Sequence, residues 1–97
     1  MAYTIVFMPA VRRQVGPLPE RLRERLRRRI AALSPDPHGP GTKALSAKLQ
    51  GLRRLRVGEY RVIYQVDEAS QTIRIVRVGH RSDVYDTLAR MELESPE

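Results

Sequence analysis

Residues 52–64 read Leu-Arg-Arg-Leu-Arg-Val-Gly-Glu-Tyr-Arg-Val-Ile-Tyr, two runs rich in β-forming residues on either side of Gly58-Glu59. A two-residue Gly-X connection is typical of a type II′ hairpin turn, and such a turn fixes how the flanking strands pair. The sequence therefore predicts strands over 52–57 and 60–67, joined in one antiparallel hairpin. In that register Val57 faces Tyr60 and Arg56 faces Arg61.

Because side chains alternate between the two faces of a strand, this register assigns each hairpin residue to a face. One face is apolar and should lie under helices; it holds Leu55, Val57, Tyr60 and Val62. The other face holds Arg54, Arg56, Arg61 and Ile63, and we expect no acidic residue on it in these two strands. Like charges directly opposite each other are destabilising unless an anion lies between them. The pattern favours an anion-binding surface, and the alternative is a set of arginines that extend into water.

Downstream, a third β-rich run covers 72–79, and the chain should leave the sheet at Gly79. Asp83 is a suitable cap for a final helix over 84–93. We expect the residues of this exit to cluster near the end of the sheet; they are His80, Arg81 and Tyr85. A structural and a catalytic role are both open for His80 on the pattern alone.

Upstream, the sequence predicts one strand, two helices and a loop. The strand covers 3–7, and a short helix covers 10–15. The second helix covers 19–33, because apolar residues recur there at the spacing of one helical face, at Leu22, Leu26, Ile30 and Leu33. Residues 34–42 are dense in proline and glycine and predict a loop, whereas 43–50 should be irregular or a short helical turn.

Arginines fill the rest of the 19–33 helix, and two interpretations compete. A nucleic-acid-binding helix would present them to phosphates. However, Glu20 and Glu24 are placed to form ion pairs with arginines three or four positions further along, Arg23, Arg27 and Arg28. The sequence therefore favours a solvated, salt-bridged helix face.

Length and charge limit the remaining possibilities. The 97 residues suffice for one compact domain over 1–97. A formal net charge of +7 favours a polyanionic partner, whether a nucleic acid, an acidic protein or a membrane. The chain has no cysteine, which excludes disulfides and thiolate metal sites. No stretch reads as a secretory signal or a membrane span, so we expect a cytoplasmic protein with no membrane partner.

The hairpin 52–64, followed by Val78-Gly79-His80-Arg81-Ser82-Asp83-Val84-Tyr85, resembles the signature of the RelE/ParE toxin superfamily. The other predicted elements come in the order of that family over nearly the whole chain. The resemblance implies an α+β fold: a small antiparallel β-sheet with two N-terminal helices packed on one face and a short C-terminal helix, β-α-α-β-β-β-α. The opposite, concave face would then bind RNA.

The same resemblance implies the toxin of a type II toxin-antitoxin system. Such a toxin is a ribosome-dependent, metal-independent endoribonuclease (mRNA interferase), in which the ribose 2′-hydroxyl attacks the adjacent phosphate. Its expected partners are a cognate antitoxin with an acidic amphipathic segment, mRNA in the ribosomal A site, and the 70S ribosome; no cofactor or metal is expected. Arg61 and Arg81 match the family's phosphate-contacting arginines, and Tyr85 matches the tyrosine that orients the nucleotide. Further basic residues are expected to contact the RNA, namely Arg53, Arg54, Arg56, Lys43 and Lys48.

The proton acceptor is the point where this sequence departs from the family. The best-known RelE toxins carry lysines on the first hairpin strand, where this chain has Leu52 and Arg54. Leucine transfers no proton, and arginine stays protonated in proteins, so Arg54 can only neutralise charge. His80 is then the better candidate for proton transfer, and Tyr85 is a weaker candidate. Two alternatives stay open: a ParE-like inhibitor of DNA gyrase without nuclease activity, and a catalytically silent domain that binds RNA or an antitoxin.

Overall fold

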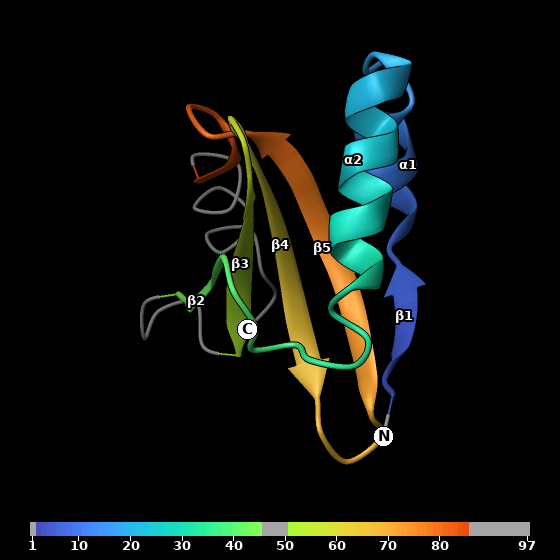
Figure 1. Ribbon diagram of the computed structural model, residues 1–97, viewed down its shortest axis with the longest axis vertical. Coiled ribbons are helices and arrows are strands. Elements are labelled where there is room, and N and C mark those ends of the chain that lie inside the picture. The colour runs from blue at the N-terminus through green and yellow to red at the C-terminus, as the bar shows by residue number, and fades with distance from the viewer. Residues whose placement is uncertain (1, 46–50, 86–97) are drawn as a thin grey trace, which may run out of the picture.

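The computed structural model describes residues 2–45 and 51–85, which form a five-stranded sheet with two helices packed on one face (Figure 1). In chain order the elements are β1 (Thr4–Phe7), α1 (Pro9–Val15), α2 (Glu20–Ala31), β2 (Thr42–Ala44), β3 (Leu52–Val57), β4 (Tyr60–Asp67) and β5 (Thr72–His80). The expected α+β class is confirmed. The predicted bounds of the hairpin strands are confirmed at both ends, and the helices begin and end within two residues of their predicted limits.

The hairpin of β3 and β4 has the predicted register. Val57 pairs with Tyr60 and Arg56 with Arg61. Gly58 has φ +60°, in the left-handed region that glycine adopts readily, whereas Glu59 does not have a positive φ. A type I′ turn needs positive φ at both central residues, so the geometry agrees with the predicted type II′ turn.

The strand order is β1-β5-β4-β3-β2, and two of its features were not predicted (Figure 1). β1 lies at one edge and pairs with β5 in parallel, so the sheet is mixed rather than wholly antiparallel. At the other edge, β2 pairs with β3, which corrects the expectation of irregular chain from residue 43 onward; residues 46–50 lie outside the described part. Neither edge pairing is encoded in hydrophobic periodicity, because both depend on which strands meet in space.

The main core lies between the sheet and both helices. Leu26, Ile30 and Leu33 are buried on the predicted face of α2, with Leu22 partly buried beside them. They pack with Val11 of α1 and with the inward residues of the sheet, Leu55, Val57, Val62, Tyr64, Ile73, Ile75 and Val78. The buried Tyr64 hydroxyl donates a hydrogen bond of 2.6 Å to the carbonyl of Pro37, which attaches the loop before β2 to the sheet.

A β-bulge in β5 lets that strand keep its apolar side chains in this core. Ile73 and Ile75 face inward, and Val78 also does, although it is an odd number of residues further on. The pairing shifts between Ile63 and Tyr64 of β4, so that Val76 is the extra residue of β5. The bulge therefore places Arg77 opposite Ile63, on the sheet face away from the helices.

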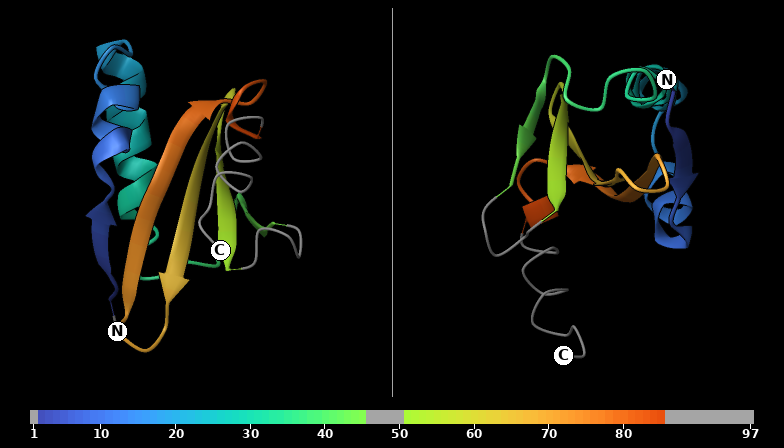
Figure 2. Two further views of the ribbon diagram at one scale, coloured as in Figure 1. Left: turned by 180° about the vertical axis from the view of Figure 1, so that it is seen from behind. Right: turned by 90° about the horizontal axis from the view of Figure 1, so that it is seen from below.

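A second, smaller cluster lies on that far face. Ile63 and Val84 are both fully buried there, with Leu45 and Leu52 packed against them. Residues 81–85, which follow β5, therefore fold back over the sheet, on the side opposite the helices (Figure 2). Val84 and Tyr85 are helical, as expected for the start of the final helix, whose remaining residues 86–93 lie outside the described part. Within residues 2–45 and 51–85, no helix is long and apolar enough to cross a membrane.

Replacing Leu26 with alanine should destabilise the protein by about 2 to 5 kcal/mol, because its side chain is 1% exposed and its loss leaves a cavity in the main core. Urea unfolding followed by circular dichroism measures this. The control is Arg23→Ala on the exposed side of the same helix, which should change the free energy of unfolding by less than about 0.5 kcal/mol. Equal effects of the two substitutions would contradict the placement of the core.

Candidate active site

The sheet face away from the helices carries two rows of basic residues, which we call the arginine face. The first row runs across β2 to β5 through paired positions, Lys43, Arg54, Ile63 and Arg77. The second row, next to the hairpin turn, holds Arg56, Arg61 and Gly79. Four of the predicted basic residues therefore share a face, and Arg77, which was not predicted, lies on it with them.

The hairpin turn holds both of the arginines that were predicted to contact phosphate. Arg61 Nη1 donates hydrogen bonds of 2.9 Å to the carbonyls of Gly58 and of Tyr60. The backbone N–H of Arg81 donates to the Glu59 carbonyl at 2.8 Å, and Arg81 Nε lies 2.7 Å from Glu59 Oε1. One turn thus positions two guanidinium groups that are 20 residues apart in the sequence.

These contacts leave donors of both arginines available to an anion. Within residues 2–45 and 51–85, Arg61 uses Nη1 for the carbonyls, so its Nε and Nη2 remain, and Arg81 keeps both terminal nitrogens. A guanidinium group can bind two phosphate oxygens at once through its planar set of N–H donors. Donors fixed in advance can stabilise negative charge that develops on a phosphate during a reaction.

Two carboxylates of the hairpin, those of Asp67 and Glu59, differ in how directly they neutralise the arginines of the candidate site. Asp67 lies on the arginine face, against our expectation that the hairpin would place no acid there, because it is an even number of residues from Arg61. It lies at the far end of β4, 3.7 Å from Arg74, and the N–H of Ser70 lowers its pKa. Glu59, in contrast, forms an ion pair with Arg81 itself. Both side chains of the Glu59–Arg81 pair are more than 60% exposed, so water and salt weaken it.

Arg53 lies apart from the other basic residues of β3. It faces the helices, where Arg53 Nε donates to the Tyr64 hydroxyl at 3.3 Å and Nη2 donates to Thr42 Oγ1 at 3.0 Å. These bonds attach β2 and the loop at Pro37 to the core. The structure therefore places Arg53 in a bracing position, away from the arginine face.

His80 lies at the end of β5, one residue past the predicted exit. It pairs with Tyr60, and the two rings meet edge to face at 5.6 Å. Gly79, the preceding residue, pairs with Arg61, so His80 and Arg61 are neighbours whose side chains leave opposite faces of the sheet. The Nδ1 atom of His80 is 2.8 Å from Ser82 Oγ and accepts the Ser82 N–H at 3.2 Å. Nε2 is then the ring nitrogen that remains for a substrate.

Tyr85 follows Val84 directly in the chain, and Val84 fixes where this segment lies. Val84 is buried against Ile63, so the segment 81–85 lies against the arginine face, and Tyr85 remains 36% exposed there. Lys43 is exposed at the edge of the first row. Lys48 lies outside the described residues.

The chain is similar to toxins of known type. A family model described as the ParE toxin of type II toxin-antitoxin system, parDE, matches residues 9–85. Toxin RelG of Mycobacterium tuberculosis is 37% identical over 86 residues, which are 88% of this chain and 98% of that toxin. The residue range of the family match includes the arginine face and the exit from β5.

Solved structures show the same fold. A chain of the toxin-antitoxin complex RelBE2 from Mycobacterium tuberculosis aligns with a TM-score of 0.73 and 34% identity, covering 84% of this chain and 100% of that one. A chain of the archaeal RelE-RelB complex from Pyrococcus horikoshii aligns with a TM-score of 0.74 and 25% identity, covering 87% and 100%. The first is a toxin-antitoxin complex, and the second is a complex of RelE with RelB.

Replacing Glu59 with glutamine should strengthen the binding of single-stranded RNA by up to about fivefold, because it releases Arg81 from a weak, exposed ion pair. Fluorescence anisotropy with a short 2′-O-methylated RNA, which resists cleavage by its own 2′-hydroxyls, measures the affinity. Glu68→Gln, at the other end of β4, makes the same change in net charge and serves as the control. If the two variants bind RNA equally, the gain is a general charge effect and Glu59 does not compete for Arg81.

Proposed function

Because this chain belongs to the RelE/ParE superfamily of type II toxins, we propose that it is an endoribonuclease that cleaves messenger RNA held in the A site of the 70S ribosome. The observation that carries the proposal is the hairpin turn that holds Arg61 and Arg81 together, at the end of a face lined with further basic residues. A face lined with basic residues suits a polynucleotide substrate, which carries a phosphate group between each pair of neighbouring nucleosides. Since ribosomes lie in the cytoplasm, the protein would act there.

In the proposed reaction, the 2′-oxygen of a ribose attacks the adjacent phosphorus, and the bond from phosphorus to the 5′-oxygen of the next nucleotide breaks. The products are a 2′,3′-cyclic phosphate and a free 5′-hydroxyl. One proton leaves the 2′-hydroxyl, and one is delivered to the departing 5′-oxygen. Charge builds on the phosphate oxygens in between, where Arg61 and Arg81 would stabilise it without a metal ion.

The proton transfers fall to His80 in this proposal. In the tautomer whose Nδ1–H donates to Ser82 Oγ, Nε2 would take the proton of the 2′-hydroxyl and return it to the departing 5′-oxygen. His80 leaves the sheet opposite Tyr60 rather than Arg61, so the RNA would have to wrap around the end of β5 to meet both. Tyr85, exposed beside the arginine face, is suited to stack on a nucleotide and orient it.

We also propose where the antitoxin binds. An apolar groove between β1, α1 and α2 is lined by Phe7, Val11, Val15, Leu26 and Ile30, and it is bordered by Arg12, Arg23 and Arg27. Phe7 is 44% exposed, and the outer edge of β1 has no strand beside it in the described part of the chain. An acidic amphipathic segment complements both the apolar lining and the basic border. A second copy of this chain would instead bring together two proteins of net charge +7.

Arg61→Ala and Arg81→Ala should each abolish growth inhibition and reduce mRNA cleavage by about 100-fold or more, because each removes a fixed donor to the phosphate. Primer extension on messenger RNA after induction maps the cuts, and urea unfolding verifies that both variants fold. Arg74→Ala, at the far end of the same face, is the matched control and should still cut. If the wild-type protein inhibits growth and DNA supercoiling but produces no cuts in messenger RNA, it is a gyrase inhibitor, and the nuclease proposal is refuted.

His80→Ala should slow cleavage by about 10² to 10⁴-fold while RNA affinity stays nearly unchanged, because the imidazole transfers a proton and does not hold the phosphate. Single-turnover cleavage on programmed ribosomes separates the rate from the affinity. Ser82→Ala, which removes one of the two Ser82 contacts to Nδ1, should give a smaller loss. Full cleavage by His80→Ala would remove His80 from the mechanism.

Phe7→Asp should weaken binding of the cognate antitoxin without affecting the toxicity of the protein alone, because it places a charge in the apolar groove. Val6→Asp is the matched control: Val6 is equally exposed, at 41%, but lies on the opposite face of β1 and does not line the groove. Growth upon co-expression of toxin and antitoxin reports the binding in cells. Equal rescue of the two variants by the antitoxin would place its binding site elsewhere.

A further inference from the structure

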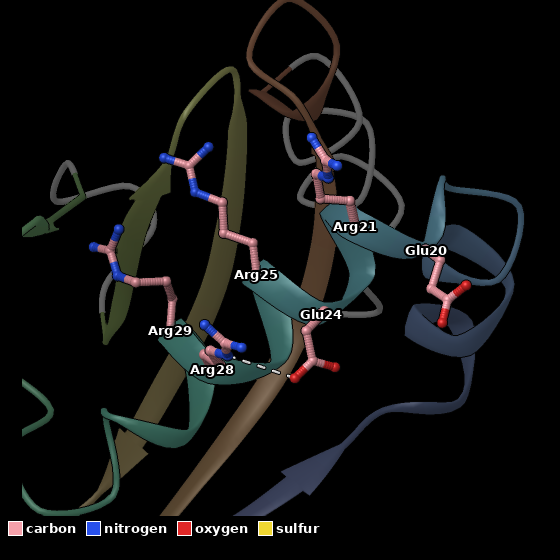
Figure 3. Close-up of a pocket in the computed structure, with 6 residues that line it drawn as sticks. All are labelled: Glu20, Arg21, Glu24, Arg25, Arg28 and Arg29. Carbon is pink, nitrogen blue, oxygen red and sulfur yellow. Dashed lines mark ion pairs between the residues drawn. The ribbon is translucent and has the colours of Figure 1, made fainter.

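Helix α2 carries a line of arginines that the arginine face does not include. Arg21, Arg25 and Arg29 are four residues apart and lie along the side of the helix turned toward the hairpin (Figure 3). Four residues of α-helix advance about 6 Å, so the three guanidinium groups form a regular row, which we call the helix ridge. It lies on the helix side of the sheet, whereas Arg61 lies on the other side.

The acidic residues of α2 do not neutralise this row. Glu24 is bonded to Arg27, and Arg28 Nε lies 3.5 Å from Glu24 Oε2. The hydrogen bond from Arg27 lowers the pKa of Glu24, which therefore stays ionised with these partners. Glu20 points away from the ridge (Figure 3). Among the described residues, the ridge arginines form no ion pair, so the predicted pairing accounts for only part of the charge of this helix.

Two glycines accommodate the ridge against the sheet. A Cβ atom added to Gly58 would lie 3.0 Å from Arg25 Nη1, and one added to Gly41 would lie 2.7 Å from Arg29 Nη2. The guanidinium groups therefore lie directly over the backbone at both points. Gly58 also accepts the hydrogen bond from Arg61 through its carbonyl, so Arg25 and Arg61 approach the same turn from its two sides.

The lining of the groove along the ridge indicates the kind of partner. It consists of charged residues alone, Glu20, Arg21, Glu24, Arg25, Arg28 and Arg29. Protein interfaces generally need an apolar centre, which the groove on the other side of α2 offers and this one lacks. Contacts to a nucleic-acid backbone are made instead through phosphates and need no apolar anchor.

We propose that Arg21, Arg25 and Arg29 bind the phosphate backbone of a structured RNA, as a second RNA surface separate from the arginine face. The choice of RNA as the polyanion rests on the proposed action at the ribosome, where folded RNA surrounds the message. The ridge would hold the protein against this RNA, while the arginine face receives the strand to be cut. Helix α2 then separates an RNA surface from the apolar groove proposed for the antitoxin.

The test compares two triple variants of the full chain. One replaces the ridge arginines, Arg21→Gln, Arg25→Gln and Arg29→Gln. The matched control replaces three arginines that border the apolar groove instead, Arg12→Gln, Arg23→Gln and Arg27→Gln, with the same change in charge. Binding to a short mixed-sequence RNA duplex is measured by anisotropy over a series of salt concentrations. Loss of the ridge should reduce the slope of log affinity against log salt by about 2 to 3, because about 0.9 is lost for each phosphate contact.

The control triple should leave the slope nearly unchanged. Equal reductions in both triples, or no duplex binding by the wild type, would overturn the proposal. An equal reduction of the salt slope with poly-glutamate as the probe would also overturn it, because the ridge would then bind any polyanion. If the ridge triple unfolds in urea earlier than the wild type, Arg25→Gln alone replaces it, with an expected reduction of about one.

Arg61→Ala separates this inference from the proposed function. It should abolish cleavage and still bind the duplex through the ridge. Wild-type protein that binds duplex through the ridge but cuts no message would refute the nuclease proposal alone. Cleavage lost in Arg61→Ala, together with a ridge triple that binds duplex like the wild type, would refute the ridge alone.

Discussion

The structure depends on the register that the Gly58-Glu59 turn imposes on β3 and β4. That register places Leu55, Val57 and Val62 under the helices and Arg54, Arg56 and Arg61 on the opposite face, and a slip of one residue would exchange the two sets. The same turn supplies the carbonyls that hold Arg61 and the carboxylate that holds Arg81. Folding and the geometry of the candidate site therefore share one local constraint.

Local constraints are also what the sequence predicted well. The two-residue turn determined the pairing of Arg56 with Arg61, and the apolar spacing of α2 identified Leu26 and Ile30 as core residues. The parallel pairing of β1 with β5 was not predicted, because it depends on where the helices return the chain. Arg77 was missed for a related reason. Ile73 and Ile75 have odd numbers and Val78 an even one, a change of alternation that signals a bulge, and only the bulge places Arg77 on the arginine face.

In the candidate site, too, the features set by local sequence were predicted and those set by contacts between distant segments were not. The predicted register placed Arg61 beside the turn, whereas the Glu59 carboxylate on Arg81 was not predicted, because an exposed ion pair is not encoded in any periodicity. His80 faces Tyr60 rather than Arg61 because β5 continues one residue beyond the predicted exit at Gly79. A single residue of strand length changes the face on which the imidazole lies, and strand ends are where patterns of alternation carry least information.

Gly79 shows how closely the interior and the working surface of this protein are joined. It lies opposite Arg61, and a Cβ atom there would come within 3.3 Å of Val84 Cβ. Even a methyl group would thus press on Val84, whose side chain is buried against Ile63 and holds residues 81–85 to the sheet. The strand position that pairs with Arg61 is therefore also the one on which Val84 packs, and a larger residue there would loosen residues 81–85.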